Sequence, residues 1–216
     1  MKLATVIQSG ALADEFARLR RDLDALSPTP RHLVVTGAAG REGVTTVSTH
    51  LALAMAGGRT DARVLLVDGN LRHPTLEQDL GLTAGPGLLD WDTVGPLPVR
   101  PMACVPGLQV LTAGRQGPAT QGGPSIEERL MAACERVRLE YAASVWDSPP
   151  LLRYHDGLDL AAQCDGTLLV IEMDQTRAGG LRYVRSALER RRAVLLGSVL
   201  NRSGRYWPRS PRQPSA

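Results

Sequence analysis

Short apolar runs alternate with amphipathic stretches along most of the chain. Six of the apolar runs have the length and composition of buried parallel strands: 32–36, 63–67, 108–114, 143–146, 166–173 and 193–201. Such strands are continuously apolar because helices cover both faces of a parallel sheet. The alternation therefore predicts a single α/β domain with a doubly wound, mostly parallel sheet and crossover helices on both faces.

Apolar residues at helical spacing fill the stretches before and between these runs. The first such stretch ends before Pro28 and Pro30, and a later one opens with Ser125 and Glu128 in capping-box spacing. Residues 81–107 are rich in Gly and Pro and predict an irregular connection with a short helical turn. The stretches that predict helices are 9–26, 45–58, 125–141 and 179–192.

Length and composition fit one globular domain. The chain has 216 residues, of which 43% are hydrophobic and 22% are charged. No run reaches the ~18 apolar residues of a membrane span, and the N-terminus lacks the apolar stretch of a signal peptide. We therefore expect a cytoplasmic protein that reaches the inner face of a membrane only through a partner.

Positive charge is concentrated towards the C-terminus, although the net charge is only +3. Arginines cluster at 182–192 and 202–212, and a solvated helix face with a floppy tail explains them about as well as an acidic partner does. We expect no nucleic-acid binding. The expected organisation is an N-terminal helical segment at 1–30, the α/β domain at 31–202 and a disordered, basic, Pro-rich tail at 203–216.

Polar residues follow several predicted strands, at the carboxyl ends where open α/β sheets bind ligands. Strand 32–36 leads into the glycine-rich loop 37–46, with the sequence GAAGREGVTT. Asp68, Asp147 and Asn201 follow three other strands. Because the carboxyl ends of parallel strands meet at one edge of a sheet, these residues predict a nucleotide site there.

Loop 37–46 has the features of a phosphate-binding loop. Gly40 and Gly43 permit a tight turn, and the following helix offers its positive end to an anion. Thr45 is a candidate magnesium ligand together with Asp68 and Asp147. The expected cofactors are ATP or ADP and Mg²⁺. The loop residues expected to bind the nucleotide are Ala39, Gly40, Arg41, Glu42, Gly43, Val44, Thr45 and Thr46.

Several motifs, in order, resemble those of the cytoplasmic domain of bacterial tyrosine kinases (BY-kinases), which govern capsule and exopolysaccharide synthesis. BY-kinases are relatives of the MinD/ParA-type P-loop ATPases. VVTGAAGREGVTT aligns with the Walker A loop of that family, VLLVDGNLRHP with its second acidic motif and VWDSPPLL with its Walker B segment. GSVLN resembles the closing strand, in which Asn201 would contact the base. The resemblance covers roughly residues 11–201.

The same resemblance implies partners. EFARLRR matches the E-x-x-R-x-x-R helix of BY-kinases on Glu15, Arg18 and Arg21, which implies contacts between subunits in ring-like homo-oligomers. It also implies a membrane-anchored protein of polysaccharide chain-length control or export as the partner through which this chain would act.

The departures from the family pattern concern catalysis. Val44 replaces the Walker lysine, and Asn70 replaces the second acid of the family's D-x-D motif. Asp68, Asn70 and Asp147 thus form an impaired catalytic set, because Asn70 cannot accept a proton from a tyrosine hydroxyl. The tail offers only Tyr206 as a possible phosphosite, where the family carries a tyrosine cluster.

Three nucleotide-dependent functions remain open on the sequence, beside an interaction protein that binds no nucleotide, and enzyme activity is undecided among them. The first is a BY-kinase-like regulatory subunit with weakened catalysis. The second is an active tyrosine autokinase in which Arg41, or an arginine of a neighbouring subunit, replaces the missing lysine charge; we expect Arg41 to point to solvent instead. The third is a MinD/ParA-like scaffold or positioning ATPase, which the match on Glu15, Arg18 and Arg21 disfavours.

Overall fold

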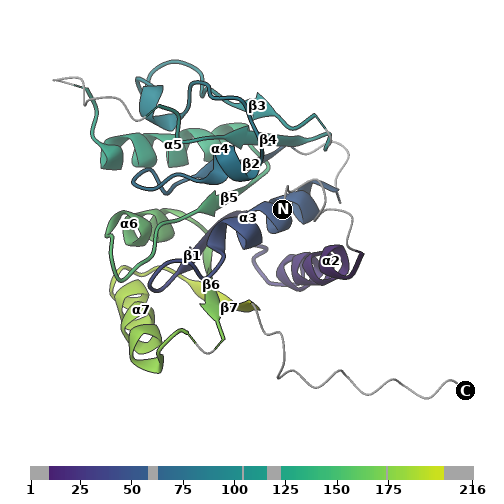
Figure 1. Cartoon of the computed structure of the whole chain (residues 1–216), viewed down its shortest axis with the longest axis vertical. Helices are drawn as coiled ribbons and strands as arrows, with labels where there is room; N and C mark the ends of the chain where they lie inside the picture. The colour runs from purple at the N-terminus through teal and green to yellow at the C-terminus, as the bar shows by residue number, and fades with distance from the viewer. Residues whose placement is uncertain (1–9, 58–62, 104, 116–122, 174, 202–216) are drawn as a thin grey trace, which may run out of the picture.

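A seven-stranded sheet runs through the centre of the molecule in the order β3-β4-β2-β5-β1-β6-β7 (Figure 1). All neighbouring strands pair in parallel except β3 and β4, which are antiparallel. A computed structural model describes residues 10–57, 63–103, 105–115, 123–173 and 175–201. The strands are β1 (His32–Gly37), β2 (Val64–Asp68), β3 (Arg100–Pro101), β4 (Leu108–Leu111), β5 (Ala143–Asp147), β6 (Gly166–Glu172) and β7 (Leu195–Asn201).

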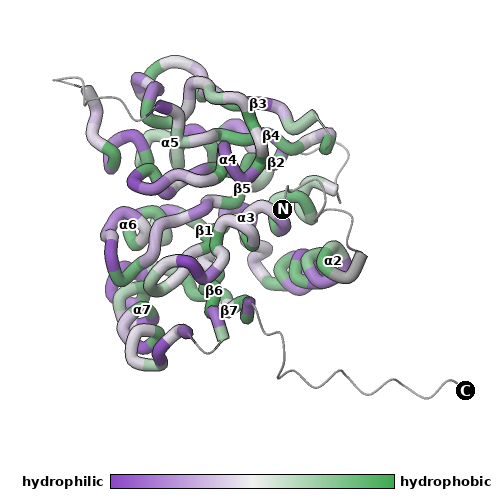
Figure 2. The backbone as a smooth tube through the Cα atoms, viewed as in Figure 1, coloured by the Kyte–Doolittle hydropathy of each residue, from purple (hydrophilic) through white to green (hydrophobic). Residues whose placement is uncertain are grey.

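Helices cover both faces of this sheet and make three layers (Figure 1). One face carries α2 (Gly10–Asp24) and α3 (Val44–Gly57), and the other carries α5 (Ile126–Glu140), α6 (Asp156–Gln163) and α7 (Ala178–Arg190). Hydrophobic residues run along the central strands in the tube of Figure 2. Two short elements, α4 (Leu76–Asp79) and η1 (Leu88–Asp90), lie between β2 and β3. The predicted doubly wound α/β fold is confirmed.

Most of the predicted elements occur within a residue or two of their expected positions. The capping box is confirmed: Ser125 accepts a hydrogen bond from the Glu128 amide, and the Glu128 carboxylate accepts one from the Ser125 amide. β3 was missed because a two-residue strand has no periodicity to detect. At the start of α6, His155 holds the N-cap position, and the Asp156 carboxylate pairs with Arg72.

The N-terminal helix α2 packs on α3 and shares its hydrophobic core. Phe16 and Leu23 are buried in the cluster that also contains residues of α3 and the sheet. The Phe16 ring stacks on the His50 imidazole of α3 at a centroid distance of 5.2 Å. Segments 1–9 and 203–216, including the expected disordered tail with Tyr206, lie outside the described residues.

Among the helices that the structure describes, none has both the length and the apolarity needed to span a membrane.

Candidate functional site

Loop 37–46 connects β1 to α3 at the carboxyl edge of the sheet. Three of its residues have left-handed backbone conformations: Gly40 (φ 103°), Arg41 (φ 72°) and Gly43 (φ 89°). Glycine adopts such angles easily, whereas a residue with a β-carbon pays roughly 1–2 kcal/mol for them. The loop therefore holds Arg41 in a strained conformation that its neighbours must stabilise.

Asn201, at the end of β7, supplies part of that stabilisation. Its side-chain Nδ2 donates a hydrogen bond of 2.8 Å to the carbonyl oxygen of Glu42. The amide lies so close to Gly43 that a β-carbon at that position would collide with it. Asn201 thus anchors loop 37–46 to the far strand of the sheet; its expected contact with a nucleotide base stays a prediction.

The carboxylate of Glu42 folds back into the loop. The backbone amides of Ala39 and Gly40 donate to its two oxygens at 2.7 and 2.8 Å. The residue is only 3% exposed, and its carboxylate lies against Gly37, where a β-carbon would come within 2.6 Å of Oε2. Two of the amides expected to face a phosphate are therefore bound to an acid of the loop itself. Sequence reasoning placed Glu42 in the loop but missed this role.

Val44 begins α3 and turns its side chain inward. It packs against the core cluster of α2 and α3, and a β-carbon on Gly37 would lie 3.1 Å from its Cγ2. The next two residues have hydroxyl groups: Thr45 Oγ1 lies 3.3 Å from Thr75 Oγ1, and Thr46 is exposed. An apolar side chain thus occupies the position at which a lysine would carry charge.

Asp68 and Asp147 end the neighbouring strands β2 and β5 and lie opposite each other in the parallel register. Their residue exposures are 0% and 2%. One Asp68 oxygen accepts from the amide of Asn70 at 3.2 Å, and the other accepts from the amide of Leu76 at 3.3 Å. The Ser48 hydroxyl donates to Asp147 at 3.4 Å. Ser48 also was missed, although it follows Thr45 by three positions and so shares its side of the helix.

Burial of this pair disfavours negative charge on both side chains. Desolvation raises the pKa of Asp147 to about 7, against the lowering effect of hydrogen bonds from Thr45 and Ser48. Desolvation and then the charge of Asp147 raise the pKa of Asp68 well above its ordinary value. A divalent cation beside such a pair would favour the ionised forms.

The residues present suit Mg²⁺ better than a metal that needs three or more protein side chains as ligands. The described residues contain no cluster of three or more His, Cys, Asp or Glu side chains that could hold a metal. Mg²⁺ usually takes only one or two carboxylates and keeps waters or phosphate oxygens as its other ligands. Asp68, Asp147 and the hydroxyl of Thr45 supply that kind of partial ligand set.

Asn70 carries an unsatisfied oxygen at this edge. Its Nδ2 donates to the His73 carbonyl at 3.0 Å, whereas its buried Oδ1 has no hydrogen-bond partner among the described residues. A buried acceptor without a partner costs about 1–3 kcal/mol. The atom is therefore available to accept a hydrogen bond from a water or from a ligand hydroxyl.

Arg72, which follows β2, forms an ion pair with Asp156. Its guanidinium donates to both oxygens of Asp156, at 2.6 and 3.2 Å. It also lies over the Tyr154 ring, 5.3 Å from the ring centroid. These contacts raise the pKa of Arg72, chiefly through the hydrogen bond to Asp156.

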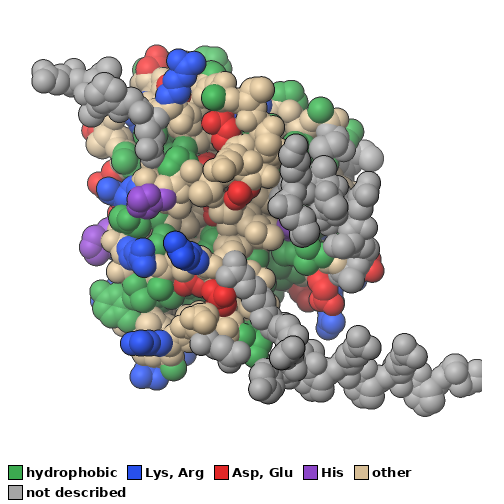
Figure 3. All heavy atoms as spheres, in the orientation of Figure 1, with side chains coloured by type: hydrophobic (Ala, Val, Ile, Leu, Met, Phe, Trp, Pro, Cys, Tyr) green, Lys and Arg blue, Asp and Glu red, His purple; other side chains and the backbone are tan. Residues whose placement is uncertain are grey.

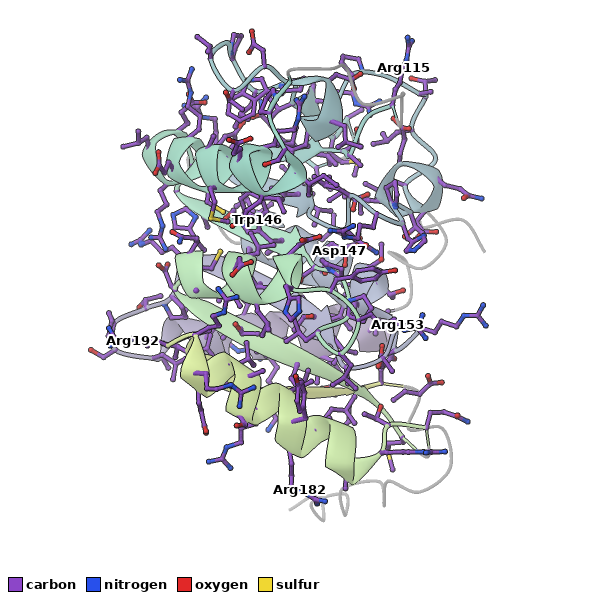
Figure 4. All side chains as sticks on the ribbon, turned by 90° about the vertical axis from the view of Figure 1, so that its left-hand side faces the viewer. Arg115, Trp146, Asp147, Arg153, Arg182 and Arg192 are labelled. Atoms are coloured by element: carbon purple, nitrogen blue, oxygen red, sulfur yellow. The ribbon has the colours of Figure 1, made fainter. Side chains whose placement is uncertain are left out.

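A cavity of about 620 Å³ opens beside loop 37–46. One wall is the loop from Ala38 to Glu42, and the other is the connection between β6 and α7, including Glu172 and Arg177. Arg41 and Arg177 both line it, and neither forms an ion pair with any residue that the structure describes. Basic side chains also gather over α6 and α7 in Figure 3. Figure 4 shows Arg153, Arg182 and Arg192 pointing away from Asp147.

The structure thus brings most of the predicted site residues to one edge of the sheet. Loop 37–46 lies beside the paired ends of β2 and β5, and Asn201 reaches the loop from β7. Glu15, Arg18 and Arg21 do not join this site, because they lie on the exposed face of α2.

The sequence is similar to curated tyrosine kinases, although no family model matches it. It is 30% identical to EpsB of Ralstonia nicotianae, named as a candidate tyrosine-protein kinase, over 78% of this chain and 22% of that protein. The chain therefore spans about a fifth of the length of that relative. It is 26% identical to the tyrosine-protein kinase YwqD of Bacillus subtilis, over 87% of this chain and 76% of that protein.

Solved structures show the same fold. The VpsO kinase domain superposes with a TM-score of 0.76 at 27% identity, covering 94% of this chain and 99% of that one. The MinD protein of Pyrococcus horikoshii, solved with Mg-ADP, gives a TM-score of 0.66 at 22% identity, over 81% of this chain and 71% of that one. The chain is therefore similar in sequence to bacterial tyrosine kinases (BY-kinases), and it shares the fold of their kinase domains and of MinD-type ATPases.

Proposed function

We propose that this chain is a regulatory, nucleotide-binding BY-kinase subunit of exopolysaccharide or capsule production whose phosphoryl transfer is weakened. The observation that carries the proposal is the buried pair of Asp68 and Asp147 beside Thr45, in a site where Val44 stands in place of the lysine. The acidic half of a Mg·nucleotide site is retained, and the basic half is missing.

The retained half supports binding of Mg·ADP or Mg·ATP. Asp68, Asp147 and Thr45 would hold Mg²⁺ directly or through its waters, and the amides at the start of α3 would face the phosphates. Bound Mg²⁺ would neutralise charge on the phosphate oxygens. Asn201 keeps loop 37–46 in place from β7, so the backbone part of the cradle does not depend on a lysine.

The absence of the lysine and of the base lowers the rate of phosphoryl transfer more than the affinity for nucleotide. Charge builds on the phosphate oxygens during phosphoryl transfer, and a lysine there stabilises it most at that moment. Val44 packs into the core and supplies no charge. Asn70 holds an amide where a base is needed, which removes a factor of about 10²–10⁴ if an acid there acts as the base.

The exposed residues of α2 support a role in assembly. Glu15, Arg18 and Arg21 all face solvent, while Phe16 and Leu23 hold the opposite face of the helix in the core. None of these three charged residues forms an ion pair with another described residue. They are therefore available to contact a second copy of the chain, and through that assembly a membrane-anchored partner.

The test is calorimetric titration of Mg·ADP and Mg·ATP into the purified chain and into Val44→Lys. We expect wild-type binding, tightened about tenfold or more by the lysine, since a charge-assisted hydrogen bond to phosphate contributes about 1.5–3 kcal/mol. Asp147→Asn is the matched control that should lose magnesium dependence. Absence of nucleotide binding in all three proteins would contradict the proposal.

A second candidate, an active autokinase, is favoured by Arg41 and Arg177, which line the cavity beside the loop without an acidic partner among the described residues. If they replace the lysine charge, the wild type should autophosphorylate, and Arg41→Gln or Arg177→Gln should abolish the signal. An anti-phosphotyrosine immunoblot distinguishes the two candidates, because the regulatory subunit should stay unlabelled.

A further inference from the structure

The third acid at this site, Glu42, is used neither by the magnesium ligand set nor by the core. Its carboxylate is buried, yet the described residues offer it no cation, and it accepts hydrogen bonds from the amides of Ala39 and Gly40. A carboxylate that accepts two adjacent backbone N–H groups occupies the position of an oxyanion. The loop is thus closed by an anion of its own.

We infer that Glu42 is an internal competitor for the phosphate position, and that a phosphoanion binds only when this carboxylate leaves the amides of Ala39 and Gly40. The inference rests on the proposed nucleotide function and adds the residue that sets the affinity of the same site. The exclusion is geometric, because an amide hydrogen directed at Glu42 cannot also be directed at a phosphate oxygen.

The surroundings favour two positions for the side chain. The inward position is held by the two amides and by the Asn201 contact to the Glu42 carbonyl, which fixes the backbone from which the side chain projects. Outward, the cavity of about 620 Å³ opens beside the same residue and is lined by Arg41 and Arg177. A displaced carboxylate would enter a space lined by these two arginines and by the carboxylate of Glu172.

Val44 strengthens this competition. A lysine at that position would attract phosphate and could also pair with a displaced Glu42, whereas an apolar side chain does neither. The loop amides then remain the main attraction for any anion near the end of β1, and Glu42 is tethered within reach of them. An intramolecular competitor acts at a high effective concentration, so it lowers the apparent affinity for free ligands.

The experiment titrates Mg·ADP and, separately, inorganic pyrophosphate into wild type, Glu42→Gln, Glu42→Asp and Glu172→Gln. Glu172→Gln removes a carboxylate from the opposite wall of the same cavity and is the matched control. We expect at least about tenfold tighter binding in Glu42→Gln and no change in Glu172→Gln. Glu42→Asp keeps the charge but is one methylene too short to reach both amides, so it should bind as tightly as Glu42→Gln.

The outcomes separate the inference from the proposed function. If Glu42→Asp binds with wild-type affinity while Glu42→Gln binds more tightly, the negative charge of residue 42 repels the ligand in general. That result would overturn the inference that Glu42 competes for the phosphate position. Equal affinity in wild type and Glu42→Gln would overturn it too, and would leave nucleotide binding intact. Tighter pyrophosphate binding by Glu42→Gln without any Mg·ADP binding would support the competitor and contradict the nucleotide function. Absence of binding by every variant to both probes would overturn both.

Discussion

Asp68 and Asp147 face each other at the ends of two hydrogen-bonded parallel strands, and both are almost completely buried. Burial raises the pKa of both carboxyl groups, and the charge of Asp147 adds to the cost of ionising Asp68. The two groups therefore act as a proton-binding site when no cation lies between them.

The first prediction concerns stability against pH. The pKa of Asp147 is raised from 3.8 to about 7 on folding, so between those pH values the folded protein binds a proton that the unfolded chain does not. This contribution is fully present below the unfolded pKa and is lost as pH rises through about 7. We expect wild type to gain about 1 kcal/mol per pH unit, relative to Asp147→Asn, as pH falls from 7 to 5. Urea unfolding of both proteins at pH 5, 6 and 7 measures this difference. An identical pH slope for the two would contradict it.

The second prediction concerns the cation. Mg²⁺ favours the ionised carboxylates and should displace the bound proton. Addition of Mg²⁺ at pH 7 should raise the melting temperature of wild type and weaken its pH dependence. Asp147→Asn and Asp68→Asn should show neither effect in the same thermal scans. Ca²⁺ is a useful comparison, because a site with few protein ligands suits it less well.

The third prediction restores the chemistry that the sequence lacks. Val44→Lys together with Asn70→Asp supplies both the missing charge and the missing base. We expect tyrosine phosphorylation to rise by about 10² or more over wild type, provided that a tyrosine can reach the site. A radiolabelled-ATP assay on wild type, each single variant and the double variant measures it. Val44→Lys alone should cost some stability, because Val44 packs against the core of α2 and α3. A double variant no more active than wild type would show that more than these two positions is altered.

The fourth prediction concerns assembly. Arg18 lies on the exposed face of α2, so Arg18→Glu should leave the melting temperature within a degree or so of wild type. If this face contacts a second subunit, sedimentation velocity should show a shift from oligomer to monomer. Arg182→Glu makes the same charge change on α7, where Figure 4 shows the side chain pointing outward, and should leave the oligomer intact. Equal sedimentation of both variants would argue against the α2 face.

The fifth prediction concerns the anchor of loop 37–46. Gly43 has φ 89° and lies against Asn201, so Gly43→Ala forces both a strained backbone and a displaced amide. We expect a loss of about 1–3 kcal/mol in unfolding free energy and weaker nucleotide binding. Gly57→Ala is the control, because a β-carbon there would meet nothing within 4 Å. That change should be neutral or slightly stabilising.

The strands and the location of the site could be predicted from sequence because both depend on local patterns. Several apolar runs that became strands are followed by a polar residue, and parallel pairing brings Asp68 and Asp147 together without further information. The short strand β3 escaped because a pair of residues shows no period.

The position of the Glu42 carboxylate could not have been predicted in the same way. It depends on the left-handed angle of Arg41 and on a hydrogen bond from Asn201, which lies 159 positions further along the chain. Neither the angle nor the long-range contact leaves a signal in the local sequence. The local sequence indicates which side chains a loop contains, whereas tertiary contacts decide which of them binds the loop's backbone amides.

The stack of Phe16 on His50 links α2, with its exposed charged face, to α3, the helix that follows loop 37–46. His50 Nδ1 donates a hydrogen bond to the Thr46 carbonyl, 2.7 Å away, so the residue on which α2 packs also contacts the first turn of α3. Any rearrangement of α2 on meeting another subunit would act on the same helix that presents its N-terminus to phosphate. Thermodynamic linkage makes such an effect reciprocal: a ligand that favours the assembled form would itself bind more tightly to the assembly than to the free chain.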